Sequence, residues 1–378
     1  IRIPGLVGMI LIGFMFGPYC LNILDDSLIK ISPYLRQIAL IIILTRSGLN
    51  LDLPSLKKVG RSAILMCFIP ATFEIIGVTI ASYFFLHISI FEGLLLGSVL
   101  AAVSPAVVSP RMIKIIEEGY GENNQVPKMI LAGSSCDDIF VIVLFYAFLG
   151  LNETGTFDAW SIAKIPISIV LGILLGVIVG FFLSFIFKKI SLNVISKVVI
   201  TLSISFLLVG LEEFLKKYVS ISSLLSIIVF AMILLIKDEK GSKQLSSSYN
   251  SLWNVFEVLL FTLVGSSLNF NYLTKVGIMG LLTLLIGLVF RIIGVYVCLI
   301  GTKLTLKEKL FSMISYLPKA TVQASIGGIA LGVGLGVGEL ILVISILSIL
   351  ITAPIGAFLV DLSYKHLLNK EISVEYSD

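Results

Sequence analysis

Two adjacent carboxylates, Asp137 and Asp138, lie in the middle of the apolar run 126–150. About 20 apolar residues cross a bilayer core of roughly 30 Å, so this run places both acids near the centre of a membrane. An acid at that depth costs about 2.5 kcal/mol or more, and it usually marks the path of an ion or a proton. A buried acid pair that binds nothing is the alternative, and the pattern described below makes it the weaker one.

Asp138 is the candidate residue for binding a cation and a proton in turn. A carboxylate can ligate a monovalent cation or accept a proton, and each event excludes the other. Asp137 either assists Asp138 or serves as a hydrogen-bonded structural acid. Ser134 and Ser135 lie one helical turn earlier and could add hydroxyl ligands on the same face. Their hydroxyls could equally bond carbonyls of their own helix.

Three further charges lie deep in apolar runs: Glu74, Arg291 and Lys319. Arg291 stays charged at any accessible pH and therefore needs a buried partner. Glu74 is the first candidate and Asp137 is the rival, and we expect a structural or gating role for the pair. Lys319 follows Pro318, where a helix end exposes carbonyls, and we interpret it as compensating that partial negative charge alone.

The elements that carry these charges are long apolar segments. The chain is 57% hydrophobic and 13% charged, whereas soluble domains average about 25% charged residues. These values predict an all-α polytopic membrane protein. Twelve apolar runs are visible, at 3–18, 34–49, 62–86, 91–113, 127–150, 161–187, 192–211, 221–236, 252–268, 276–300, 310–334 and 339–364.

The 27 lysines and arginines support this count. If every run crosses the membrane, most of these residues fall on one side, which the positive-inside rule makes cytoplasmic. The visible start and the C-terminus are then both cytoplasmic. Because the chain begins at Ile1 inside an apolar run, we expect a further helix upstream, giving 13 or more in the full protein.

Prolines interrupt two of the runs. Ser104-Pro105 and Ser109-Pro110 lie in the fourth run, and Pro318 lies in the eleventh. Proline inside a helix removes a donor and breaks or kinks it. The two runs cross in opposite directions, and each is the middle of three. Inverted repeats with paired broken helices predict a transport site at the midplane, although two ordinary kinked helices are the simpler alternative.

Other residue types exclude several classes. The four cysteines occur singly, and the two histidines lie near run ends, so neither a disulfide framework nor a histidine metal site is expected. Without a nucleophile–base constellation we expect no enzyme, no cofactor and no nucleic-acid partner. Gly172, Gly176 and Gly180 indicate close helix packing.

Four segments, taken in order, carry a family resemblance: AVSPAVVSP at 102–110, AGSSCDDI at 132–139, FRIIG at 290–294 and LPKATVQASIG at 317–327. They resemble the monovalent cation:proton antiporters, specifically the sodium/proton exchangers of the second family and their NHA-type branch. The resemblance implies exchange of Na⁺ or Li⁺ for H⁺ by alternating access. It makes Asp138 the principal cation ligand and proton carrier, with Asp137 beside it.

The same resemblance implies a homodimer in the lipid bilayer. The expected location is the cell (inner) membrane if the source is bacterial, with an organelle membrane as the alternative for another source. The resemblance divides the chain into an ion-binding core at 59–150 and 276–366 and panel or linking helices at 1–58 and 188–275. A linking helix at 151–187 and a cytoplasmic tail at 367–378 complete this division.

One residue departs from part of the family. Electrogenic members carry a lysine where Arg291 stands, so the resemblance predicts one proton per cation and electroneutral exchange here. Three alternatives remain: a K⁺/H⁺ exchanger of the same fold, a Na⁺-coupled organic-anion symporter, and a membrane protein that transports nothing. Adjacent acids would repel an anionic substrate, which disfavours the symporter.

Overall fold

The computed structural model describes residues 4–50, 60–154, 159–215, 218–219 and 221–370. The expected tail at 367–378 therefore lies largely outside the described residues, as does the segment at 51–58 near the expected panel–core boundary. The chain forms two compact units. One comprises Ile1–Ile23, Asp52–Phe145 and Val264–Asp378, and the other comprises Leu24–Leu51 and Tyr146–Leu263.

The first unit is built from helices of both expected repeats and also includes the N-terminal helix, which the sequence analysis grouped with the panel. Its helices are α1 (Gly5–Phe16), α4 (Arg61–Met66), α5 (Ile69–Phe85), α6 (Ile90–Leu100), α7 (Pro105–Glu117), most of α8 (Val126–Thr154), α13 (Phe270–Cys298), α14 (Leu306–Ser315), α15 (Thr321–Ile326), α16 (Ile329–Gly332) and α17 (Gly338–Leu367).

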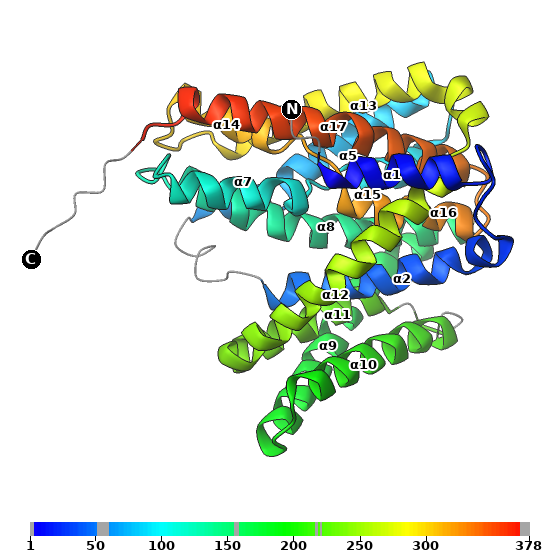
Figure 1. The fold of residues 1–378 in the computed structure, drawn as a ribbon, viewed down its shortest axis with the longest axis vertical. Coiled ribbons are helices and arrows are strands. Elements are labelled where there is room, and N and C mark those ends of the chain that lie inside the picture. Colours follow the sequence, from blue (N-terminus) through cyan, green and yellow to red (C-terminus); the bar gives the residue numbers. More distant parts are fainter. Residues whose placement is uncertain (1–3, 51–59, 155–158, 216–217, 220, 371–378) are drawn as a thin grey trace, which may run out of the picture. The chain divides into compact units, whose positions relative to one another are not determined.

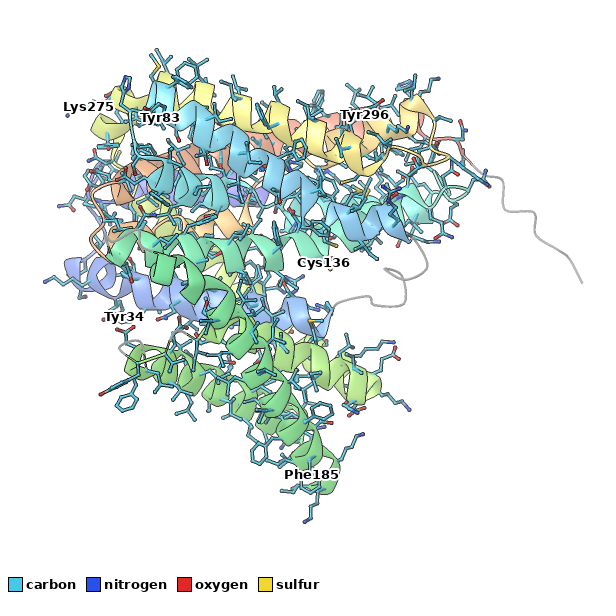
Figure 2. The ribbon with its side chains drawn as sticks, turned by 180° about the vertical axis from the view of Figure 1, so that it is seen from behind. Tyr34, Tyr83, Cys136, Phe185, Lys275 and Tyr296 are labelled. Atoms are coloured by element: carbon cyan, nitrogen blue, oxygen red, sulfur yellow. The ribbon has the colours of Figure 1, made fainter. Side chains whose placement is uncertain are left out.

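Helix α5 packs along α13 on one side and α6 on the other (Figure 1). Glycines on α13 permit the close approach. A Cβ at Gly294 would lie 2.8 Å from the Cα of Pro70, and one at Gly287 would lie 2.6 Å from the Val78 side chain. Small residues of this kind let membrane helices approach closely. On the outer side, Tyr83 of α5 and Tyr296 of α13 are exposed (Figure 2).

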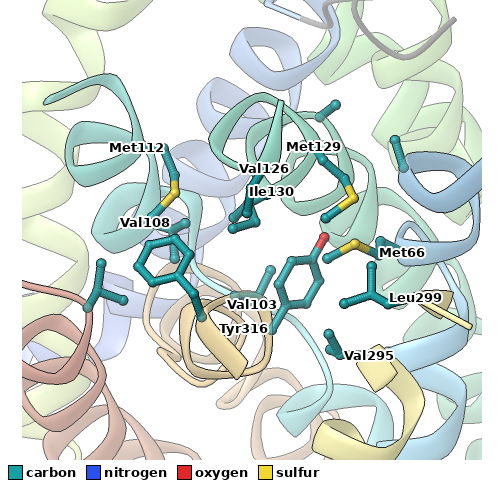
Figure 3. Packing of buried hydrophobic residues seen from close by; sticks show 14 of the residues in the cluster. Met66, Val103, Val108, Met112, Val126, Met129, Ile130, Val295, Leu299 and Tyr316 are labelled. Carbon is teal, nitrogen blue, oxygen red and sulfur yellow. The ribbon is translucent and has the colours of Figure 1, made fainter. Parts of the chain in front are cut away.

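A buried apolar cluster joins α4, α7, α8, α13, α14 and α17. Figure 3 shows the Tyr316 ring among Met66, Met129, Val295 and Leu299. Because Tyr316 directly follows α14, this packing fixes the point where that helix ends.

Two backbone breaks lie inside the first unit, and they contact each other. The first break, residues 101–104, separates α6 from α7, and the second break, residues 316–320, separates α14 from α15. The Ser104 backbone N–H donates to the Pro318 carbonyl at 2.8 Å. Buried backbone that is not helical must find such partners.

The prediction of a helix break was wrong at one of its two serine–proline sites. Pro105 is the first residue of α7, as expected for a proline that starts a helix. Ser109 and Pro110, however, lie inside α7. A proline there removes the bond to the carbonyl four residues earlier, at Ala106, and its ring crowds that carbonyl. Helix α7 nevertheless continues through this position to Glu117.

The second unit contains α2 (Asp26–Leu49), the end of α8, α9 (Ala159–Lys189), α10 (Val194–Leu215), α11 (Ser223–Lys237) and most of α12 (Glu239–Ser266). Helix α11 packs along α9 and α2. A Cβ at Gly172 would lie 2.7 Å from the Ser222 carbonyl, and one at Gly176 would lie 2.6 Å from the Ser226 carbonyl. A Cβ at Gly180 would lie 2.7 Å from the Ile233 side chain. The predicted close packing at these glycines is confirmed.

Eight helical segments among the described residues are long and apolar enough to cross a membrane. The other four apolar runs correspond to α1, α11, α12 and the broken segment α14–α16. Helices account for all regular structure in the described residues apart from one isolated bridge between Tyr120 and Lys370. The all-α fold is confirmed, and the count of twelve crossings stays a prediction.

Candidate functional site

Arg291 joins the two breaks. Its Nε donates to the Tyr316 carbonyl at 2.7 Å, where α14 ends, and its Nη1 donates to the Ala101 carbonyl, where α6 ends. The side chain is fully buried. Carbonyls at a helix C-terminus lack intrahelical donors and carry partial negative charge. One guanidinium therefore satisfies one open carbonyl at the end of each half-helix.

The same guanidinium binds two acids. Nη1 lies 2.8 Å from Glu74 Oε2, and Nη2 lies 2.8 Å from Asp137 Oδ2. The sequence analysis left Glu74 and Asp137 as rival partners, and the structure pairs Arg291 with both. A planar group with donors in a fork can do this, whereas a single ammonium could not reach all four acceptors.

Lys319 is a second cation in the cluster. Its Nζ lies 2.5 Å from Glu74 Oε2, the oxygen that Arg291 also contacts, and both side chains are fully buried. The interpretation of Lys319 as compensating a helix end alone was therefore wrong. Its position directly after Pro318 in the second break places the ammonium against α5, where Glu74 lies.

Asp137 also supports the first break. Its Oδ2 accepts from the Val103 backbone N–H at 2.8 Å as well as from Arg291. This amide has left the helix and would otherwise be a buried donor without a partner, which costs about 1–3 kcal/mol. Asp137 thus holds a backbone segment and a guanidinium at once.

The four residues Glu74, Asp137, Arg291 and Lys319 form what we call the charge network. Its two acids and two bases balance in formal charge. The next residue, Asp138, is 4% exposed, and its Oδ1 is buried without a hydrogen-bond partner among the described residues. No salt bridge within the part of the chain that the structure describes involves Asp138. It is a buried acid beside a network that is already neutral.

The serines before the acid pair bond their own helix. Ser134 Oγ and Ser135 Oγ both donate to the Leu131 carbonyl, at 3.1 and 2.8 Å. This is the second of the two alternatives that the sequence left open. Each hydroxyl oxygen keeps lone pairs that can still accept a hydrogen bond or contact a cation.

Two neutral residues that the sequence analysis did not single out also serve the breaks. Gln323 Nε2 donates to the Leu100 and Ala102 carbonyls at 3.2 and 2.9 Å. Thr352 Oγ1 of α17 accepts from the Lys319 backbone N–H at 2.9 Å. In the sequence, the only sign of these roles is a polar side chain in an apolar run. Many serines and threonines of this chain show the same sign and bond carbonyls of their own helices.

Among the described residues, the buried side-chain atoms near the breaks that lack a hydrogen-bond partner are oxygens. Ser104 Oγ, Thr321 Oγ1 and Gln323 Oε1 are buried and have no hydrogen-bond partner in the described residues. Carboxylate, hydroxyl and amide oxygens suit hard cations such as Na⁺ rather than soft metals. The described residues contain no group of three or more His, Cys, Asp or Glu placed to hold a resident metal. The donor set fits a transported monovalent cation.

Comparisons with known proteins agree with this chemistry. The family profile described as "Sodium/hydrogen exchanger, transmembrane" matches residues 1–361. Sodium/hydrogen exchanger 9B2 of Mus musculus is 32% identical over 97% of this chain and 69% of its own length. Sodium/hydrogen exchanger 9B1 of Homo sapiens is 33% identical over 95% of this chain and 72% of its own length.

A solved structure has the same fold. The sodium proton antiporter MjNhaP1 from Methanocaldococcus jannaschii superposes with a TM-score of 0.83, covering 97% of this chain and 93% of that one, at 22% identity. At that identity the likeness establishes the fold alone and leaves the roles of individual residues to the geometry described above.

Proposed function

The chain belongs to the family of transmembrane sodium/hydrogen exchangers, and from this premise we propose that it exchanges Na⁺ or Li⁺ for H⁺ with Asp138 as the ion carrier. The observation that supports Asp138 is its position. It is a buried acid without a counter-charge among the described residues, next to a network whose charges already cancel.

The chemistry of exchange follows from that imbalance. An isolated carboxylate in a buried site is costly unless it is neutralised. A proton and a monovalent cation can each neutralise Asp138, and they cannot occupy the same oxygens together. The carrier therefore crosses loaded with one ion or the other, which couples their opposite movements. Asp137 is the poorer carrier, because Arg291 already neutralises its charge and its Oδ2 accepts from both Arg291 and the Val103 N–H, which leaves only Oδ1 open.

Alternating access in this proposal is a movement of the first unit, which contains the charge network, both breaks and Asp138. The network keeps the two broken helices together during that movement. We carry forward from the sequence the core and panel roles, a homodimer, a location in the cell (inner) membrane, and cytoplasmic placement of the visible start and the C-terminus. No prosthetic cofactor is needed, since the exchanged ions are substrates.

The first test measures proton flux in proteoliposomes after addition of Na⁺, Li⁺ or K⁺. We expect Na⁺ and Li⁺ to evoke flux in the wild type, and Asp138→Asn and Asp138→Ala to abolish it. Added Na⁺ should raise the melting temperature of the wild type and leave that of Asp138→Asn unchanged. Glu239→Gln, which removes an exposed acid paired with Lys243, is the matched control and should behave as the wild type.

The outcomes separate the alternatives. Flux evoked by K⁺ alone would make the chain a K⁺/H⁺ exchanger of the same fold. Folded protein that gives no cation-evoked flux would favour the organic-anion symporter. Equal stabilisation of wild type and Asp138→Asn by Na⁺ would place the cation elsewhere.

The second test concerns stoichiometry. Arg291 retains its proton, so we propose that only Asp138 exchanges one, giving one H⁺ per cation. Exchange should then be electroneutral. At zero potential and matched pH, a Na⁺ gradient should drive proton flux without a current on solid-supported membranes, and clamping the potential should leave the flux unchanged. A Na⁺-dependent current under these conditions would show that a second group carries charge.

A further inference from the structure

Three consecutive residues at the junction between α4 and α5 meet one face of α8. A Cβ at Gly133 would lie 2.9 Å from Met66 Cβ, so the helices touch there. The rings of Phe68 and Phe140 lie 6.2 Å apart between centroids. Gly133 and Phe140 are separated by seven residues, about two helical turns, and so share a face of α8. These two contacts fix the register of the junction against the helix.

One cysteine lies between the two contacting residues of the α4–α5 junction, and another lies between the two contacting residues of α8. Cys67 falls between Met66 and Phe68, and Cys136, which is labelled in Figure 2, falls between Gly133 and Phe140 in α8. A spacing of three and four residues from these two places it on the same face of the helix. The contacts on either side of them bring Cys67 and Cys136 next to each other. Cys67 Sγ also donates to the Ala63 carbonyl at 3.2 Å. Both residues are half-buried, whereas Cys298 is 2% exposed.

We propose that Cys67 and Cys136 form an oxidisable dithiol, and that its conversion to a disulfide by hydrogen peroxide slows ion exchange. Peroxide oxidises one thiolate to a sulfenic acid, breaking the O–O bond and releasing hydroxide. The second thiolate attacks that sulfur, the S–S bond forms, and the S–O bond breaks. With the two thiol protons the products are one disulfide and two waters, and the sulfurs supply the two electrons that peroxide accepts. A dithiol reductant reverses the reaction.

The position of the pair explains the effect on exchange. Cys136 directly precedes Asp137, which holds Arg291 and the first break. A disulfide keeps its two Cα atoms within about 4.4–6.8 Å of each other. It would therefore tie the junction that leads to Glu74 to the helix that carries both aspartates. The link would hold the backbone beside Asp138 fixed against α5 within the first unit, which would restrict the local adjustment by which Asp138 releases one ion and takes up the other.

The test exposes purified wild type in proteoliposomes to hydrogen peroxide and then to dithiothreitol. We expect the number of titratable thiols under denaturing conditions to fall by two, and mass spectrometry to find one peptide pair linked through Cys67 and Cys136. The exchange rate should fall in proportion to the oxidised fraction, and dithiothreitol should restore both the free thiols and the exchange rate. The inhibitory half of the proposal rests on the proposed exchange activity, whereas the linkage is measured by mass alone.

Serine variants provide the controls. Cys67→Ser and Cys136→Ser should each keep their exchange rate in peroxide, while Cys20→Ser and Cys298→Ser should lose it as the wild type does. If a serine variant fails to fold, the corresponding alanine variant replaces it. A linkage to Cys298, inhibition that persists without Cys67, or a complete disulfide with unchanged exchange would each overturn the proposal.

Discussion

The two backbone breaks lie in the same unit and contact each other, yet different partners satisfy them. The first break, 101–104, carries no charge of its own and depends on three side chains from elsewhere: Asp137, Arg291 and Gln323. The second break, 316–320, brings its own cation, Lys319, and its amide is bound by a neutral hydroxyl of Thr352.

The difference shows that similar backbone conformations do not require similar chemistry. Each break needs its carbonyls and amides satisfied in a dry interior. The chain meets that need with two charged side chains and one amide side chain at the first break, and with Arg291, the Thr352 hydroxyl and the Ser104 N–H at the second. Arg291 is the exception, because it contacts both breaks. Substitutions can therefore affect both breaks, the first alone or the second alone.

The largest effect is expected for Arg291→Leu, which affects both breaks. Removing one partner of a buried ion pair costs about 3–5 kcal/mol. Lys319 still faces Glu74 in this variant, whereas Asp137 loses its cation. Adding Asp137→Asn should therefore recover more stability than adding Glu74→Gln, as measured by melting temperature in detergent. Greater recovery with Glu74→Gln would mean that Lys319 does not neutralise Glu74.

A smaller effect is expected for Gln323→Met, which affects the first break alone. The substitution keeps the length of the side chain and removes both donors, leaving the Leu100 and Ala102 carbonyls without them. We expect a loss of about 2 kcal/mol of stability, with the second break retained. Gln37→Met, at an exposed position on α2, is the matched control. An unchanged melting temperature for Gln323→Met would show that the carbonyls find other donors.

The smallest effect is expected for Thr352→Val, which affects the second break alone. The Lys319 N–H would lose its acceptor, at a cost of about 1 kcal/mol. Thr352→Ser keeps the hydroxyl and should retain most of the stability. Hydrogen exchange at the Lys319 amide, followed by mass spectrometry, should rise in the valine variant and stay near the wild-type rate in the serine variant.

Sequence reasoning located the acids, the cations and both breaks, because a charge or a proline in an apolar run is rare enough to stand out. It could not choose between Glu74 and Asp137, since a guanidinium fork has donors for both. It overlooked Thr352 and Gln323 for a different reason. Ser345 and Ser348 lie in the same apolar run as Thr352 and bond carbonyls of their own helix, so the sequence pattern alone does not distinguish them.

The contacts of Arg291 also have a consequence for how the protein is made. Its two acidic partners precede it by 217 and 154 residues in the chain. At the usual rate of synthesis this separation amounts to on the order of ten seconds or more. During that interval the helices that carry Glu74 and Asp137 have been made, and neither Arg291 nor Lys319 has been translated. Until Arg291 and Lys319 are made, Glu74 and Asp137 must therefore be protonated or shielded. A nascent chain that stops before residue 291 could not complete its core.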